Sequence, residues 1–86
     1  MISNELVLEN PGGLHARPAT SLVQLASKFQ SKVKVIFNGR EADGKSVIAL
    51  MTLGAGQGNK ITLVADGVDE EAALAEISAY LQQAGQ

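Results

Sequence analysis

The stretch KVKVIFNGREA, residues Lys32–Ala42, decides how this chain folds. Over Lys32–Phe37 the side chains alternate between two faces, one of which is wholly apolar, as in a half-buried strand. Asn38 and Gly39 follow, and this pair readily adopts the positive φ angles of a two-residue hairpin turn. We therefore expect a second, shorter strand over Arg40–Ala42, paired antiparallel with the first.

The segments on either side of this hairpin predict two more strands and three helices. NELVLEN, residues 4–10, and KITLVAD, residues 60–66, alternate as strands do. Apolar residues at helical spacing predict a first helix over Ala16–Phe29 and a last helix that begins after Asp69. A short apolar run predicts a further helix over Val47–Leu53, stopped at Gly54.

Polar residues stand directly before the second and third predicted helices. Ser46 and Asp69 are residue types whose side chains accept a hydrogen bond from an unpaired N–H at a helix start, so we expect both to be N-caps. Glu70 and Glu71 suit the positive end of the last helix. The expected buried stripe of this helix consists of Ala73, Leu74, Ile77, Leu81 and Ala84.

The predicted element order is βαββαβα, and the 86 residues suit a single domain over residues 1–86. This order is typical of an α+β fold with one four-stranded antiparallel sheet and its helices on one face. Alternation along the strands indicates that the other face of the sheet is in contact with solvent. Aromatic residues make up only 3% of the chain, so the core must consist of leucine, isoleucine, valine and alanine.

Composition argues against several classes of function. The net charge is −2 and no basic stripe with interleaved aromatic residues occurs, so we expect no nucleic-acid partner. No apolar run approaches the ~18 residues that a membrane span requires, so we expect no membrane insertion. With no cysteine and one histidine, a disulfide is excluded and a metal site is not expected. We expect a cytoplasmic monomer without a cofactor.

The single histidine, His15, lies in NPGGLHARPA, where the first helix is predicted to begin. Unpaired N–H groups at a helix start favour anions, and phosphate is a common one, so Ala16 and Arg17 are candidates for binding it. The guanidinium of Arg17 matches the geometry of phosphate oxygens. Pro18 lacks an N–H, which costs little in a first turn. A nucleophilic histidine that carries a phosphoryl group and a surface histidine that only caps the helix both fit this pattern.

Three stretches carry a resemblance to a known family: GLHARPA at residues 13–19, GKSVIALMTLG at residues 44–54 and ADGVDEEAALAEI at residues 65–77. Together they resemble HPr, the histidine-containing phosphocarrier family of the bacterial phosphoenolpyruvate-dependent phosphotransferase system, over essentially the whole chain. The resemblance implies an open-faced β-sandwich and a carrier that is not itself an enzyme. It also implies that His15 accepts a phosphoryl group on Nδ1 from enzyme I, that Arg17 assists, and that IIA domains of sugar transporters receive the group.

The resemblance adds a regulatory candidate and a partner surface. The serine that matches Ser46 is phosphorylated in many Gram-positive members by HPr kinase/phosphorylase, which would make that enzyme a partner. Here, however, SVIAL resembles the nitrogen-related branch of the family, NPr, and a helix cap alone is the simpler interpretation. The family's partner surface corresponds to Thr20, Val47, Ile48 and Met51, whereas Leu50 and Leu53 are expected in the core.

Two other functions remain open at this point: an NPr-type regulatory phosphocarrier, and a binding module without phosphoryl transfer. GAGQGNK, residues 54–60, lacks the spacing of known phosphate loops, and we interpret it as a flexible turn. The acidic run Asp66–Glu71 is interpreted as a turn followed by a helix start rather than as a metal site.

Overall fold

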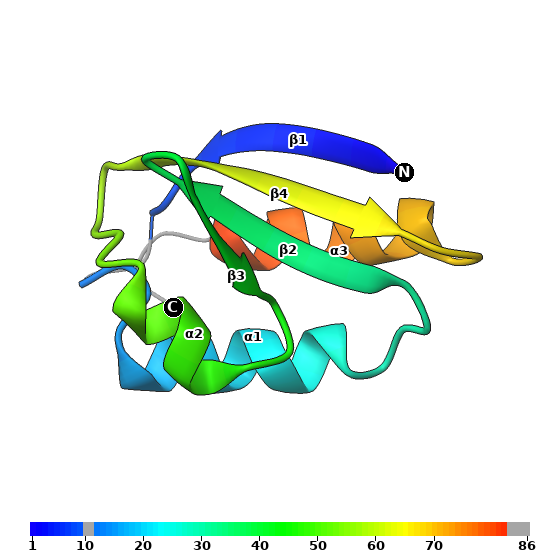
Figure 1. The fold of residues 1–86 in the computed structure, drawn as a ribbon, viewed down its shortest axis with the longest axis horizontal. Coiled ribbons are helices and arrows are strands. Elements are labelled where there is room, and N and C mark those ends of the chain that lie inside the picture. The colour runs from blue at the N-terminus through cyan, green and yellow to red at the C-terminus, as the bar shows by residue number, and fades with distance from the viewer. Residues whose placement is uncertain (10–11, 83–86) are drawn as a thin grey trace.

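The structure is a computed structural model that describes residues 1–9 and 12–82, and within them the elements follow the order βαββαβα (Figure 1). The strands are β1 (Ile2–Val7), β2 (Lys32–Phe37), β3 (Arg40–Asp43) and β4 (Lys60–Asp66). The helices are α1 (Ala16–Ala26), α2 (Val47–Thr52) and α3 (Glu70–Leu81). The predicted fold class is confirmed. Asn10 and Ala84, which the sequence pattern places in the first strand and the last helix, lie outside the described residues.

The four strands form one antiparallel sheet in the order β1-β4-β2-β3. The hairpin between β2 and β3 has the expected turn, with φ of 55° at Asn38 and 81° at Gly39. Its register pairs Phe37 with Arg40 and Val35 with Ala42, and β3 continues one residue further than predicted, to Asp43. The first strand starts at Ile2 and ends at Val7, earlier at both ends than the sequence pattern indicated.

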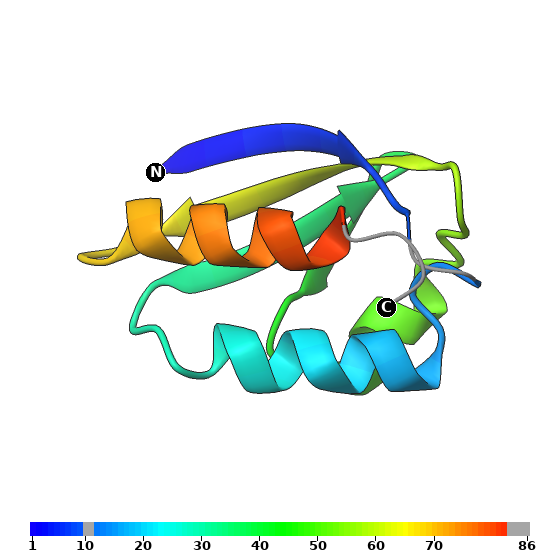
Figure 2. The same ribbon diagram turned by 180° about the vertical axis from the view of Figure 1, so that it is seen from behind.

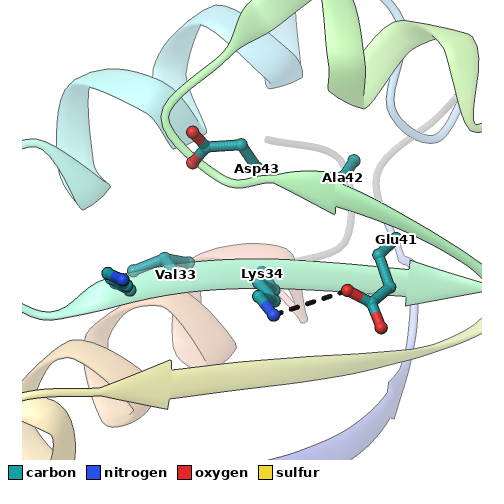
Figure 3. A pocket seen from close by; sticks show the side chains of 6 residues that line it. Val33, Lys34, Glu41, Ala42 and Asp43 are labelled. Atoms are coloured by element: carbon teal, nitrogen blue, oxygen red, sulfur yellow. Dashed lines mark ion pairs between the residues drawn. The ribbon is translucent and has the colours of Figure 1, made fainter.

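One face of the sheet is covered by helices (Figures 1 and 2). α1 and α3 lie side by side and run in opposite directions, and α2 packs against α1 and near β3. On the covered face, the alternate strand residues are buried: Leu6, Val33, Val35, Ala42, Ile61, Leu63 and Ala65. The opposite face carries polar and charged side chains, including an ion pair of 3.4 Å between Lys34 Nζ and Glu41 Oε1 (Figure 3).

α1 ends at Ala26 and not at Phe29 as predicted. The N–H groups of Lys28 and Phe29 donate to the carbonyls three residues earlier, so the chain leaves the helix through tighter turns. The ammonium of Lys45 then donates to the carbonyl of Phe29 at 2.9 Å. The apolar spacing that predicts a longer helix therefore continues into a turn that is held by a residue of the loop between β3 and α2.

The expected capping role of Asp69 is wrong in one respect. Asp69 occupies the N-cap position of α3 and its carbonyl accepts from the Ala73 N–H, but its carboxylate makes no cap hydrogen bond. The carboxylate instead accepts from the N–H of Gln30 and of Ser31, both at 2.9 Å, and from the buried Ser31 hydroxyl. These hydrogen bonds, the Ser31 hydroxyl first, lower the pKa of Asp69 below its ordinary value. They tie the start of α3 to the segment between α1 and β2.

The segment before α1 is docked on the loop that follows α2. The Leu14 N–H donates to the Ala55 carbonyl at 3.0 Å, and both residues are buried. Gly13 has φ +65°, and a Cβ there would lie 2.4 Å from the Ala55 oxygen and from Gly56 Cα. Two loops that are 40 residues apart in sequence thus approach closely only because position 13 has no side chain.

The loop over residues 54–60 is more strongly bonded than a flexible turn implies. Its Asn59 side-chain oxygen accepts from the Gly56 N–H at 2.7 Å, and the Asn59 N–H donates to the Gly56 carbonyl at 3.0 Å. The Gly58 N–H also donates to the carbonyl of Leu8, whose own N–H donates to the Asn59 carbonyl. In the part of the chain that the structure describes, no helix is long and apolar enough to cross a membrane.

Replacing Gly13 by alanine tests the docking of the two loops. We expect Gly13→Ala to lower the free energy of unfolding by about 2 to 4 kcal/mol, because it adds a left-handed φ penalty and a clash with backbone. Gly39→Ala is the matched control, since its φ is +81° but no atom lies within 4 Å of its Cβ. It should cost only about 1 to 2 kcal/mol in urea denaturation. Equal losses in the two variants would contradict the close approach.

The carboxylate of Asp69 predicts a particular dependence of stability on pH. Because the pKa of Asp69 is lower in the folded protein than its ordinary value of 3.8, its stabilising effect is complete above that value and is lost as the pH falls through the folded pKa. Asp69→Asn should therefore be less stable at neutral pH and lose less stability on acidification. The measurement is the urea midpoint from pH about 7 to about 2. Glu76→Gln, at an exposed position of α3, is the control and should keep the wild-type acid dependence.

Candidate functional site

His15 is held at the start of α1 with its side chain free of the helix. It is the N-cap residue, with extended backbone angles of φ −84° and ψ −171°, and its carbonyl accepts from the Ala19 N–H at 3.0 Å. The imidazole is exposed and makes no side-chain cap hydrogen bond. The simpler interpretation of His15 as a capping side chain is therefore not what the structure shows.

The first turn of α1 presents hydrogen-bond donors beside this ring. The first N–H that donates within the helix belongs to Ala19, so the amides of Ala16 and Arg17 come before the intrahelical ladder begins. Pro18, which is buried, has no N–H to contribute. Arg17 is exposed and adds a guanidinium on the same turn. An anion placed here would meet two amide donors, the positive helix end and a permanent cation.

A hollow of about 270 Å³ lies against the His15 ring. Its lining residues come from the segment before α1 and from the end of α2 with the loop that follows: Gly12, Leu14, His15, Met51, Gly54, Ala55 and Gly56. A Cβ at Gly12 would lie 3.2 Å from His15 Nδ1, nearer than to any other ring atom. The Nδ1 edge of the imidazole thus faces the backbone of Gly12, where a side chain would crowd it.

The residues predicted for a partner surface separate into two groups. Ile48 is 76% exposed and Met51 is 44% exposed, as expected, and Thr20 is exposed on α1 with its hydroxyl donating to the Ala16 carbonyl. Val47 is half-buried and packs against the core, so it is less exposed than Ile48 and Met51, and its place in a partner surface stays a prediction. A short helix docked on α1 buries this side and leaves the Ile48 and Met51 sides open. Leu50 and Leu53 are in the core as predicted.

Ser46 occupies the N-cap position of α2, as predicted. Its hydroxyl oxygen accepts from the Ala49 N–H at 3.3 Å, and its side chain is half-buried. The acidic run Asp66–Glu71 forms the expected turn and helix start. Within residues 1–9 and 12–82, no group of three potential metal-ligating side chains is found.

The glycine-rich part of the site carries almost no signal in the sequence. The hollow beside the imidazole is lined in part by Gly12, Ala55 and Gly56, and Gly13 allows the two loops to meet there. None of these residues carries a reactive group. Their only signal in the sequence is the high glycine content of two short loops, at residues 12–13 and 54–58. A larger hollow, of about 420 Å³, lies on the β2–β3 hairpin, and none of its lining residues belongs to the candidate site around His15 (Figure 3).

Comparison with known proteins assigns the chain to a family. Residues 2–83 match the family model described as PTS HPr component phosphorylation site. The phosphocarrier protein HPr of Buchnera aphidicola from Acyrthosiphon pisum is 40% identical, over 96% of this chain and 98% of its own. The solved structure of HPr from Thermoanaerobacter tengcongensis is 39% identical, with a TM-score of 0.91 over 95% of this chain and 92% of its own.

A third relative is Crh from Bacillus subtilis, whose solved structure is described as a dimer with a swapped domain. It is 38% identical, with a TM-score of 0.78 over 95% of this chain and 94% of its own. The family model and these relatives each span nearly the whole chain. The chain therefore belongs to the HPr phosphocarrier family of the phosphotransferase system.

Proposed function

We propose that this protein accepts a phosphoryl group on His15 from phosphoenolpyruvate-charged enzyme I and passes it to a IIA domain. The observation that supports this most directly is an exposed imidazole without a cap bond, placed directly before the first amide donors of α1. In this proposal the protein is a carrier and not an enzyme, because it supplies one nucleophile and an anion site while its partners supply the remaining chemistry.

In the proposed transfer, the lone pair of Nδ1 attacks the phosphorus and the bond between phosphorus and the donor breaks. The phosphoryl oxygens then accept hydrogen bonds from the amides of Ala16 and Arg17 and from the Arg17 guanidinium. The Nδ1 assignment rests on the family resemblance and agrees with the open edge that Gly12 provides. Transfer to the IIA domain is the reverse step with a new acceptor.

The sugar branch and the nitrogen branch of the family use the same His15 chemistry and differ in the acceptor domain. We propose the sugar branch first, and the NPr-type regulatory carrier is the alternative that the sequence SVIAL favours. Phosphorylation of Ser46 by HPr kinase/phosphorylase is a second proposal, and the phosphate would lie at the start of α2, where the Ser46 hydroxyl already accepts from the Ala49 N–H. We further propose that the protein works as a monomer in the cytoplasm, unlike the swapped dimer described for Crh.

Incubation with phosphoenolpyruvate and enzyme I tests the carrier function. The protein should gain one phosphoryl group whose bond is labile in acid and stable in alkali, and His15→Ala should gain none. Because the His15 side chain is exposed and makes no cap bond, this variant should unfold within about 0.5 kcal/mol of wild type. The control Ser46→Ala should be labelled normally while it loses about 1 kcal/mol of stability with the α2 cap.

The outcomes separate the candidate functions. An acid-stable product, or normal labelling of His15→Ala, would contradict His15 as the acceptor. A wild-type protein that takes up no phosphoryl group would favour a binding module without phosphoryl transfer. If labelled protein discharges to a nitrogen-branch IIA domain faster than to a sugar-transporter IIA domain, the NPr-type alternative replaces the sugar branch.

Arg17→Lys tests whether the guanidinium holds the phosphoryl group. The variant keeps the charge but loses the paired donors, so transfer from the phosphorylated protein to the IIA domain should slow about tenfold, equivalent to about 1.4 kcal/mol. Stability should not change, because Arg17 is exposed. Lys28→Arg, an exposed position just beyond the end of α1, is the control and should transfer at the wild-type rate. A wild-type rate for Arg17→Lys would show that Arg17 is only a surface charge.

A further inference from the structure

A side-chain hydrogen bond lies on the exposed side of the first turn of α1. The hydroxyl of Thr20 donates to the carbonyl of Ala16 at 2.8 Å. Ala16, Arg17 and Thr20 are all exposed, whereas Pro18 and Ala19, which lie between them in the sequence, are buried. The bond is therefore made beside the amides and the guanidinium of the proposed anion site, and not against the core.

The carbonyl that receives this bond is part of the anion site. A planar peptide group joins the carbonyl of one residue to the N–H of the next, so the Ala16 carbonyl and the Arg17 N–H belong to the same unit. The Arg17 N–H is one of the two amides that come before the intrahelical bonds of α1. A donor on the oxygen of a peptide group polarises the group and strengthens its N–H as a donor, by about 10–30%. The Thr20 hydroxyl thus acts on the anion site through this peptide group.

The same peptide group also needs to be held in place. Arg17 precedes Pro18, and the ring of a proline disfavours the helical conformation in the residue before it. Arg17 is nevertheless the second residue of α1, and its N–H is directed out of the helix start only while that conformation is kept. The Thr20 hydroxyl ties the Ala16 carbonyl to the next turn of the helix, and so holds the first turn against the bias of the proline.

The hydroxyl matters most when a partner covers the first turn. In the free protein the Ala16 carbonyl is on an exposed residue, and water can bond to it if the hydroxyl is removed. A protein that exchanges a phosphoryl group with His15 excludes this water, so only an internal donor still bonds to the carbonyl while the group is transferred. An interaction that is needed during transfer raises the rate of that step and leaves association unchanged.

We propose that Thr20 is a positioning residue for phosphoryl transfer, which fixes and polarises the peptide group between Ala16 and Arg17 so that the Arg17 N–H donates to the phosphoryl oxygens. This inference rests on the proposed function and adds to it a residue that acts through another. The kinetics distinguish this role from that of a surface contact. Loss of a contact raises the concentration of carrier that half-saturates its partner, whereas loss of positioning lowers the limiting rate.

The test is single-turnover transfer from phosphorylated enzyme I, with the rate measured over a range of carrier concentrations. Thr20→Val keeps the shape of the side chain and removes the hydroxyl, so it should lower the limiting rate about two- to threefold with an unchanged half-saturating concentration. Thr20→Ser keeps the hydroxyl and should transfer at the wild-type rate. Thr52→Val is the matched control, because Thr52 is also exposed and its hydroxyl donates to a carbonyl of its own helix, that of Ala49, at 2.8 Å.

The amide signal of Arg17 in NMR spectra gives a second readout, taken in the absence of a bound partner. When His15 is phosphorylated, the Arg17 amide proton should move downfield, because it then donates to a charged oxygen. This shift should be smaller in Thr20→Val than in wild type, and it should be retained in Thr20→Ser and Thr52→Val. Urea denaturation of each variant confirms that the fold is kept.

The outcomes separate this inference from the carrier function. An unchanged limiting rate in Thr20→Val, a slow Thr20→Ser or an equal loss in Thr52→Val overturns the positioning role while the carrier function stands. A rise in the half-saturating concentration alone, or an Arg17 shift that is the same in all variants, overturns it as well. A wild-type protein that takes up no phosphoryl group overturns both.

Discussion

The hydrogen bond from the Leu14 N–H to the Ala55 carbonyl, 3.0 Å long, fixes the geometry on which the rest of the site depends. Both residues are buried, so if this bond broke, water could not readily hydrogen-bond to the N–H or the carbonyl in its place. The bond joins the chain just before α1 to the chain just after α2, and Gly13 allows the two backbones to meet. As a result, the start of one helix and the end of another act as a single support for His15.

The fold could largely be predicted because its signals are local. The alternation in β2, the Asn38-Gly39 turn and the apolar stripes of the helices are each patterns formed by residues that are close together in the sequence. The errors occur where distant residues compete for the same groups. Asp69 has the sequence context of an N-cap, but its carboxylate bonds to Ser31, 38 residues away. Phe29 has helical spacing, but its carbonyl accepts a hydrogen bond from the ammonium of Lys45, which is 16 residues further along the chain.

The residues of the site also fall into two groups, those that local sequence indicates and those that depend on contacts between distant segments. His15 and Arg17 are neighbours in sequence, so the sequence alone was sufficient to suggest an anion-binding helix start with a nucleophile. The contribution of Met51, Ala55 and Gly56 depends on how two loops dock, and no spacing rule connects them to His15. The difference between half-buried Val47 and exposed Ile48 likewise depends on the angle at which α2 meets α1, which a six-residue helix does not reveal in its sequence.

A phosphoryl carrier that serves two different proteins has to solve a problem that an enzyme with a cleft does not have. Its nucleophile must be reachable from solvent, yet an exposed side chain on a loose loop would lose the benefit of orientation. Here the backbone is held on both sides of His15, by the Leu14 N–H bond before it and by the Ala19 N–H bond to its own carbonyl after it. Main-chain groups beneath His15 hold it in place, and the imidazole itself takes no part in these bonds. The ring therefore remains open to solvent while its backbone is fixed.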